Sequence, residues 1–113
     1  MEISQRIVDE KTCVISLNGT LNARSADRVK EAFREAVGKG MRRVVLDLGQ
    51  VPFIDSSGLA ALVSGLKTLN EKGGSLKLAS LQSQADLLFK LTMFDKVFEI
   101  YPDADQAIQS YTP

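Results

Sequence analysis

The feature that most constrains this chain is a strand-to-helix unit near its middle. The apolar run 44–48, interrupted only by Asp47, is typical of a central parallel strand, because such strands are covered on both faces and do not alternate. A polar turn at 55–57 follows it. The next segment places apolar side chains on one helical face: Leu59, Leu62, Val63, Leu66 and Leu69. This order of elements favours the α/β class.

Strand and helix patterns alternate along the rest of the chain. Strands are predicted near 3–8, 13–17, 43–48, 76–78 and 97–100, and a helix follows each of the last four. The short loop at 9–11 predicts an antiparallel hairpin between the first two strands. The order β-β-α-β-α-β-α-β-α therefore predicts a mixed, mostly parallel sheet in a single domain spanning 1–113.

Polar residues near the predicted helix starts suggest where the helices begin. Ser25 is a candidate cap for the first helix. A capping pair is predicted between Ser83 and Asp86 in the third helix, and another between Asp103 and Gln106 in the last.

Composition narrows the possible partners. The chain has 14 Lys and Arg and 14 Asp and Glu, so its formal net charge is zero, which argues against general binding to nucleic acid. No signal-peptide pattern is present and no apolar run approaches the ~18 residues of a membrane helix, so no membrane partner is expected.

The single cysteine, Cys13, is predicted to be a small buried side chain, and a cytoplasmic location is expected.

Histidine is absent from the chain. This removes the usual general base, the histidine-activated nucleophiles and the commonest metal ligand. No phosphate-binding glycine motif accompanies the eight glycines. We therefore expect no catalytic residue, no cofactor and no metal, and hence no enzyme.

The turn at 55–57 is the candidate functional site. Asp55 and Ser56 are both common N-cap types, and the N-terminus of a helix is partly positive. Ser56 has two interpretations: a helix cap, or a hydroxyl that accepts phosphate. Gly58 costs the helix up to ~1 kcal/mol relative to alanine, so we expect close backbone approach there, such as by a partner surface.

Phosphorylation of Ser56 would add a charge of about −1.5 to −2. The helix N-terminus would tolerate that charge, while Asp55 would repel it. The main change would thus be in surface potential, and a partner that places a carboxylate or an apolar wall on the turn would be released.

The motif Ile54-Asp55-Ser56-Ser57-Gly58-Leu59, preceded by the strand 44–48, resembles the signature of the STAS domain. The match extends to 19–22, which resembles the Gly-x-Leu-Asp that ends the family's second strand, and to the glycine pair 73–74 before the fourth strand. Within that family, the chain resembles the bacterial anti-sigma factor antagonists.

This resemblance implies a STAS-like single domain whose Ser56 is phosphorylated by a serine kinase that is also an anti-sigma factor. The unphosphorylated protein would bind that kinase, the phosphorylated protein would release it, and a serine phosphatase would restore the first state. Asn22, Asp55, Ser57 and Gly58 would form the partner-binding surface. Asn22 stands where the family often has an acidic residue, so the turn is less negative here. The output would be a sigma factor or another target of partner switching.

Two alternatives remain open at the level of sequence. A receiver-like domain would accept phosphate on Asp47 or Asp55, although such sites usually gather several carboxylates around Mg²⁺. A nucleotide- or anion-binding module would use the helix N-terminus at Ser56 and Ser57 as a cradle.

Overall fold

The computed structural model describes residues 1–111. Its five strands form one sheet in the order β1-β2-β3-β4-β5. These strands are β1 (Glu2–Ile7), β2 (Thr12–Asn18), β3 (Arg43–Gln50), β4 (Ser75–Ala79) and β5 (Glu99–Tyr101). β1 pairs antiparallel with β2, and the remaining neighbours are parallel. The predicted mixed sheet with an N-terminal hairpin is confirmed.

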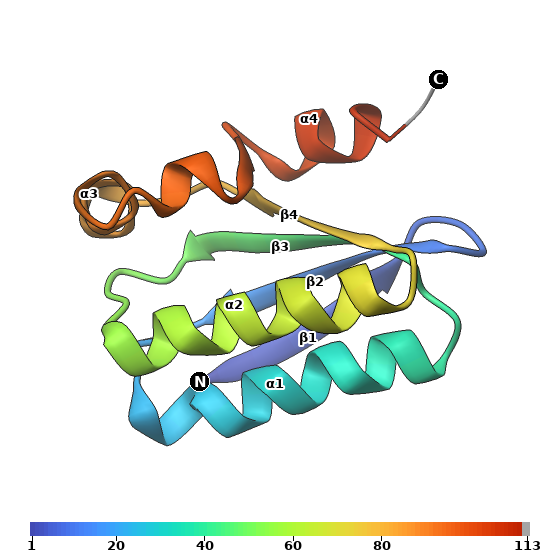
Figure 1. Cartoon of the computed structure of the whole chain (residues 1–113), viewed down its shortest axis with the longest axis horizontal. Helices are drawn as coiled ribbons and strands as arrows, with labels where there is room; N and C mark the ends of the chain where they lie inside the picture. Colours follow the sequence, from blue (N-terminus) through green and yellow to red (C-terminus); the bar gives the residue numbers. More distant parts are fainter. Residues whose placement is uncertain (112–113) are drawn as a thin grey trace.

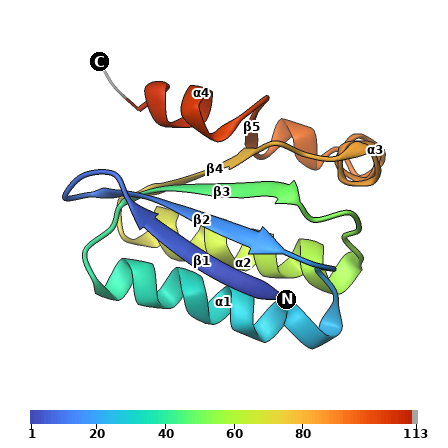
Figure 2. The ribbon, with the colours of Figure 1, turned by 180° about the vertical axis from the view of Figure 1, so that it is seen from behind.

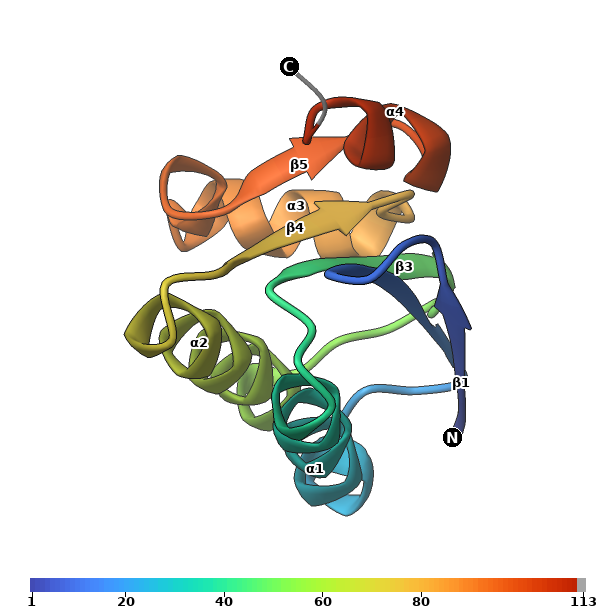
Figure 3. The same ribbon diagram turned by 90° about the vertical axis from the view of Figure 1, so that its right-hand side faces the viewer.

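Within residues 1–111, four α-helices and one 3₁₀ helix accompany these strands, and the last of them follows β5. They are α1 (Ala23–Gly38), α2 (Ser56–Glu71), α3 (Ser83–Leu91), η1 (Phe94–Lys96) and α4 (Ala104–Gln109). Figure 1 shows α1 and α2 side by side beneath the sheet. Seen from behind and from the side, α4 lies over the opposite face, above the strands at the far edge from β1 (Figures 2 and 3). None of the helices within residues 1–111 is long and apolar enough to cross a membrane.

Two apolar clusters hold these layers together. The larger cluster lies between the sheet and α1 and α2, and includes Leu46 and Phe33. The smaller one, beneath α4, includes Val45 and Ala107. Because Val45 and Leu46 are both fully buried on opposite faces, β3 is covered on both sides, as its continuous apolar pattern predicted.

The predicted helix caps were only partly correct. The cap of α1 is Asn22 rather than Ser25: Asn22 Oδ1 accepts a hydrogen bond from Arg24 N at 3.0 Å. Ser25 instead completes the capping box, because its Oγ accepts from Asn22 N at 3.0 Å. Helix α1 therefore starts before the residue predicted to cap it.

The two later capping predictions had opposite outcomes. Asp103 caps α4 as predicted, since its Oδ1 accepts from Gln106 N at 2.8 Å. The predicted pair in α3 is wrong: the residue before that helix makes no side-chain cap, and Asp86 accepts from Lys90 Nζ at 2.8 Å.

Cys13 lies in β2 with none of its surface exposed, as predicted. Burial raises the pKa of its thiol. The side chain is therefore a packed, protonated thiol in the larger cluster.

Candidate functional site

The turn lies beyond the C-terminal end of β3, where open α/β folds place their sites. Residues 51–55 carry the chain from β3 to the first turn of α2, at the same end of the molecule as α3 (Figure 1). Within this connection Ile54 is fully buried, whereas 47% of Phe53 is exposed. The connection is therefore anchored through one side chain and open to solvent at the next.

A backbone bridge joins the turn to the connector that precedes α1. Leu21 N donates to Phe53 O at 3.0 Å, and Asp55 N donates to Leu21 O at 3.1 Å. Leu21 and Ile54 thus form an isolated parallel bridge. The bridge places the connector that carries Asn22 directly beside the turn, in agreement with the shared surface that the resemblance implies for Asn22 and Asp55.

The N–H and carbonyl of Ile54 are both bound by one side chain from α3. Ile54 N donates to Gln84 Oε1 at 2.8 Å, and Gln84 Nε2 donates to Ile54 O at 2.9 Å. Gln84 is not among the predicted site residues, because a single glutamine in the first turn of a helix carries no distinguishing sequence pattern. A second glutamine, Gln82, donates from Nε2 to Gly49 O at 2.9 Å, so α3 is tied to this connection twice.

Asp55 is the N-cap of α2, and its Oδ1 accepts from Gly58 N at 2.9 Å. The interpretation of Ser56 as the helix cap is therefore wrong. Ser56 is the first residue of α2 and is exposed, and the next residue, Ser57, is half-buried. Within residues 1–111 neither hydroxyl has a hydrogen-bond partner.

Gly58 is buried, and the close backbone approach predicted there is confirmed, although the approaching surface is not the one suggested. A β-carbon at Gly58 would clash with the carbonyl oxygen of Leu21 and lie 2.7 Å from Leu21 Cγ. The close approach is made by the chain's own backbone, not by a partner. Gly58 thereby allows the bridge between Leu21 and Ile54 to form.

An apolar groove of about 410 Å³ opens beside the turn. Its lining residues come from the start of α2 and from η1: Ser56, Leu59, Ala60, Val63 and Phe94. The apolar face predicted for α2 is therefore only partly buried. Its buried members are Leu59, Leu62 and Leu69, while Val63 and Leu66 are only partly covered. Ser56 therefore lies at the edge of a groove whose lining residues carry no charge.

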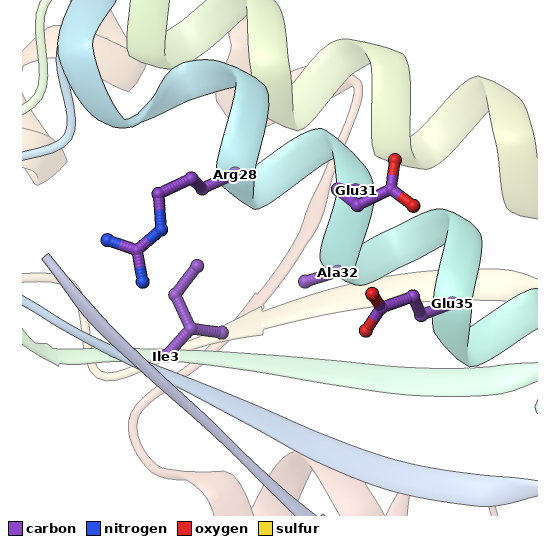
Figure 4. Close-up of a pocket in the computed structure, with 5 residues that line it drawn as sticks. All are labelled: Ile3, Arg28, Glu31, Ala32 and Glu35. Atoms are coloured by element: carbon purple, nitrogen blue, oxygen red, sulfur yellow. The ribbon is translucent and has the colours of Figure 1, made fainter.

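A second hollow, of about 280 Å³, lies between β1 and α1. Figure 4 shows Ile3 and Arg28 directed into the same gap from the two elements. Two of its three charged lining residues have partners in the fold: Arg28 donates to Met1 O at 2.6 Å, and Glu31 pairs with Arg34 at 2.8 Å. It contains none of the predicted site residues.

The geometry gives little support to an aspartate-phosphorylated receiver. Asp47 Oδ1 accepts from Gly49 N at 2.9 Å, and Asp55 caps α2. Across residues 1–111, no three His, Cys, Asp or Glu side chains gather as a metal site would require. For the anion-cradle alternative, the groove beside Ser56 supplies no basic side chain.

Comparison with known proteins gives concordant results. Residues 2–107 match the STAS domain family. The anti-sigma-B factor antagonist of Listeria monocytogenes is 30% identical over 100 residues, which cover 88% of this chain and 86% of that protein. The crystal structure of TM1081 from Thermotoga maritima has a TM-score of 0.88 and 28% identity, covering 96% of this chain and 92% of that one.

A further solved structure shares the fold at lower identity. The anti-sigma factor antagonist SpoIIAA in its unphosphorylated form has a TM-score of 0.83 and 17% identity, covering 96% of this chain and 95% of that one. The Bacillus cell fate determinant SpoIIAA has also been solved in its phosphorylated form, with a TM-score of 0.77. By its sequence, its sheet order and its relatives, the chain belongs to the STAS domain family and groups there with the bacterial anti-sigma factor antagonists.

Proposed function

We propose that this protein is an anti-sigma factor antagonist that works by partner switching. It binds a serine kinase that is also an anti-sigma factor while Ser56 is unmodified, and it releases that kinase once Ser56 is phosphorylated. A serine phosphatase restores the binding form. The observation that carries this proposal is the exposed hydroxyl of Ser56, which has no partner within residues 1–111 and stands on a turn whose backbone is held on both sides.

In the proposed reaction, Ser56 Oγ attacks the γ-phosphorus of ATP bound to the kinase. A bond forms between Oγ and phosphorus, the bond from that phosphorus to the β–γ bridging oxygen breaks, ADP leaves, and the serine proton passes to a base of the kinase. Asp55, not Ser56, supplies the helix cap, so the reaction removes no hydrogen bond from the fold. The first N–H groups of α2 lack partners within the helix and favour the added anion.

Release follows from where the phosphate would lie. Ser56 lines the apolar groove, so a partner that closes on this groove packs apolar side chains beside the hydroxyl. A phosphate carries about −1.5 to −2 charges, and burying it against apolar atoms would remove its water without a compensating partner. The kinase surface that fits the unmodified groove therefore loses affinity for the phosphorylated one.

The other predicted partner-binding residues do not line this groove but lie on or beside the turn that carries Ser56. Asp55 is half-buried and holds the first turn of α2, so it shapes the surface and keeps negative charge beside Ser56. Asn22 caps α1 through its Oδ1, a role that leaves the amide nitrogen for a partner. Ser57 adds a half-buried hydroxyl. The relatives support this proposal: proteins named as antagonists share the sequence family, and SpoIIAA exists in both phosphorylation states.

The test combines phosphate mapping with binding. The protein is incubated with each partner-switching kinase of its source organism and ATP, and the modified residue is located by mass spectrometry. We expect phosphate on Ser56. Ser56→Ala should bind the kinase whether or not ATP is present, while Ser56→Asp should bind at least tenfold more weakly, because it places a charge beside the apolar groove.

Ser83→Asp is the matched control. Ser83 is also an exposed serine at the first position of a helix, and it does not line the groove. Ser83→Asp should therefore leave the affinity for the kinase within about twofold of wild type, since a negative charge at a helix start away from the groove has little effect on that affinity. Equal affinities of Ser56→Ala and Ser56→Asp, or phosphate found only at other residues, would contradict the proposal.

A further inference from the structure

The backbone next to the phosphorylation site is held in an unusual way. Ile54 behaves as a strand of one residue whose first edge is paired with Leu21. No strand pairs with the second edge. The side-chain amide of Gln84 takes that place, with one acceptor contact of 2.8 Å and one donor contact of 2.9 Å to the same residue. A glutamine amide offers the same donor and acceptor as a peptide group, so it substitutes for a neighbouring strand.

We infer that Gln84 is a positioning residue for phosphorylation of Ser56. It fixes the backbone two residues before the acceptor, so that the hydroxyl is presented to the kinase in one geometry. This inference rests on the proposed function, because it concerns how that same serine is offered to the kinase. It adds α3 to the elements that determine the rate of the switch.

The two hydrogen bonds between Gln84 and Ile54 form a clamp on the turn, and this clamp is effective because α3 is anchored in the core. Ala85, next to Gln84, is fully buried, as is Phe89 one turn further on, so the helix start is fixed to the larger core cluster. The ring of Phe89 also packs edge-on against Phe98, with centroids 5.6 Å apart. Because α3 is fixed in this way, the side chain of Gln84 is held in place. Its hydrogen bonds therefore restrict the backbone of Ile54, thirty residues away in sequence.

Loss of the clamp should change the rate of transfer more than binding. Ile54 is fully buried, so without Gln84 its N–H and carbonyl would lack partners and the turn would shift to reach water. Phosphoryl transfer needs the attacking oxygen in line with the bond that breaks, and displacement by about 1 Å costs up to ~10²-fold in rate. Binding depends on the groove, whose apolar lining from α2 and η1 does not include Gln84.

The experiment compares Gln84→Ala with Gln82→Ala. Both remove a half-buried glutamine amide from the start of α3, but Gln82 binds Gly49 O, before the turn. For each variant, kcat and KM of phosphorylation of Ser56 by the kinase with ATP are measured. Amide hydrogen exchange at Ile54 is measured on the free protein. We expect Gln84→Ala to lower kcat about tenfold, to change KM less than threefold and to speed Ile54 exchange, while Gln82→Ala stays within twofold of wild type.

Gln84→Glu provides a second variant of equal size. Its carboxylate still accepts from Ile54 N, but it has no donor for Ile54 O and places negative charge against that carbonyl. We expect kcat to fall as in Gln84→Ala while Ile54 exchange stays closer to wild type. If Gln84→Ala does not fold, the kcat of this variant decides between the two outcomes.

The failures of the two proposals are distinguishable. A wild-type protein that receives no phosphate on Ser56 from any kinase overturns the proposed function and this inference with it. A wild-type protein that is phosphorylated normally, together with Gln84 variants whose kcat equals that of Gln82→Ala, overturns this inference alone. Unchanged Ile54 exchange in Gln84→Ala does so as well, because it would show that the clamp does not hold the turn.

Discussion

Gly58→Ala tests the arrangement of the turn most directly. In an isolated helix this change should stabilise, because alanine is favoured over glycine by up to about 1 kcal/mol. In this protein the new β-carbon would clash with the carbonyl oxygen of Leu21 and lie 2.7 Å from its Cγ. A backbone carbonyl cannot rotate away as a flexible side chain can, so either α2 or the connector at Leu21 must move.

The magnitude follows from the contacts that such a movement disturbs. Overpacking of a buried site costs about 1 to 3 kcal/mol. Moving the connector also weakens the two bridge hydrogen bonds, from Leu21 N to Phe53 O and from Asp55 N to Leu21 O, each of which contributes about 0.5 to 1.5 kcal/mol. After the helix-propensity gain of about 1 kcal/mol is subtracted, Gly58→Ala should lower the free energy of unfolding by roughly 1 to 5 kcal/mol.

Two other helical glycines provide the controls for urea denaturation. At Gly38, at the end of α1, a β-carbon meets nothing within 4 Å, so Gly38→Ala should be neutral or stabilise by up to about 1 kcal/mol. At Gly65 the β-carbon would enter the ring of Phe33, 2.8 Å from its Cζ, so Gly65→Ala should destabilise the core without touching the turn. Kinase assays should then show slower phosphorylation in Gly58→Ala than in Gly65→Ala when both are folded. A Gly58→Ala variant as stable as wild type would refute the reasoning.

Two further changes probe the cap of α2 and the attachment of α4. Asp55→Ala should cost about 1 kcal/mol of unfolding free energy, because it removes the acceptor for Gly58 N. Asp55→Asn keeps an acceptor there and should cost clearly less. Equal losses of the two variants in urea denaturation would contradict the capping role of Asp55. Burial raises the pKa of Tyr111 from 10.0 to about 12. The protonated phenol is therefore favoured in the folded state, so its contribution to stability is complete below pH 10 and is lost as the pH rises towards 12. Tyr111→Phe should reduce the loss of unfolding free energy between pH 10 and pH 12, as measured by urea denaturation. A variant with the same pH dependence as wild type would contradict the role of the Tyr111 phenol in that loss.

The parts of the fold that depend on local pattern were predictable. The continuous apolar run in β3 predicted the central strand, and the two apolar segments on either side of the short loop at 9–11 predicted the hairpin, because both signals are local in sequence. The start of α1 was misplaced because Asn22 and Ser25 are both cap-forming residue types, and the capping box uses both of them. The single turn η1 was missed, since three residues cannot show a helical period.

The setting of Lys77 shows what local pattern leaves out. Strand alternation places it opposite Leu76 and Leu78, on the face that α4 covers, and only 7% of it is exposed. Its Nζ donates to Ser110 Oγ at 2.6 Å and lies 4.1 Å from the centroid of the Tyr111 ring. These contacts join residues more than thirty positions apart, so no window of the sequence contains them.

The same limit applies to the site. The motif predicted Ser56 and Asp55 as site residues, because both lie within one short stretch. The groove and the clamp were not predictable: Phe94 and Gln84 reach the turn only through tertiary packing of η1 and α3. The partial exposure of Val63 likewise depends on the groove, although its helical spacing matches that of buried residues.

The order of Asp55 and Ser56 makes the fold compatible with the proposed switch. If a serine capped α2, phosphorylation would replace its hydroxyl cap by a bulkier phosphate, and the first turn of the helix would have to rearrange each time the signal was sent. Here Asp55 supplies the cap and Ser56 stands one position later, with its hydroxyl uncommitted. Leu21 bonds to the backbone of Phe53 and Asp55, and Gln84 bonds to the backbone of Ile54, so the segment before Ser56 is held from both sides. The modification can therefore change the surface beside the groove while the helix, the bridge and the sheet stay as they are.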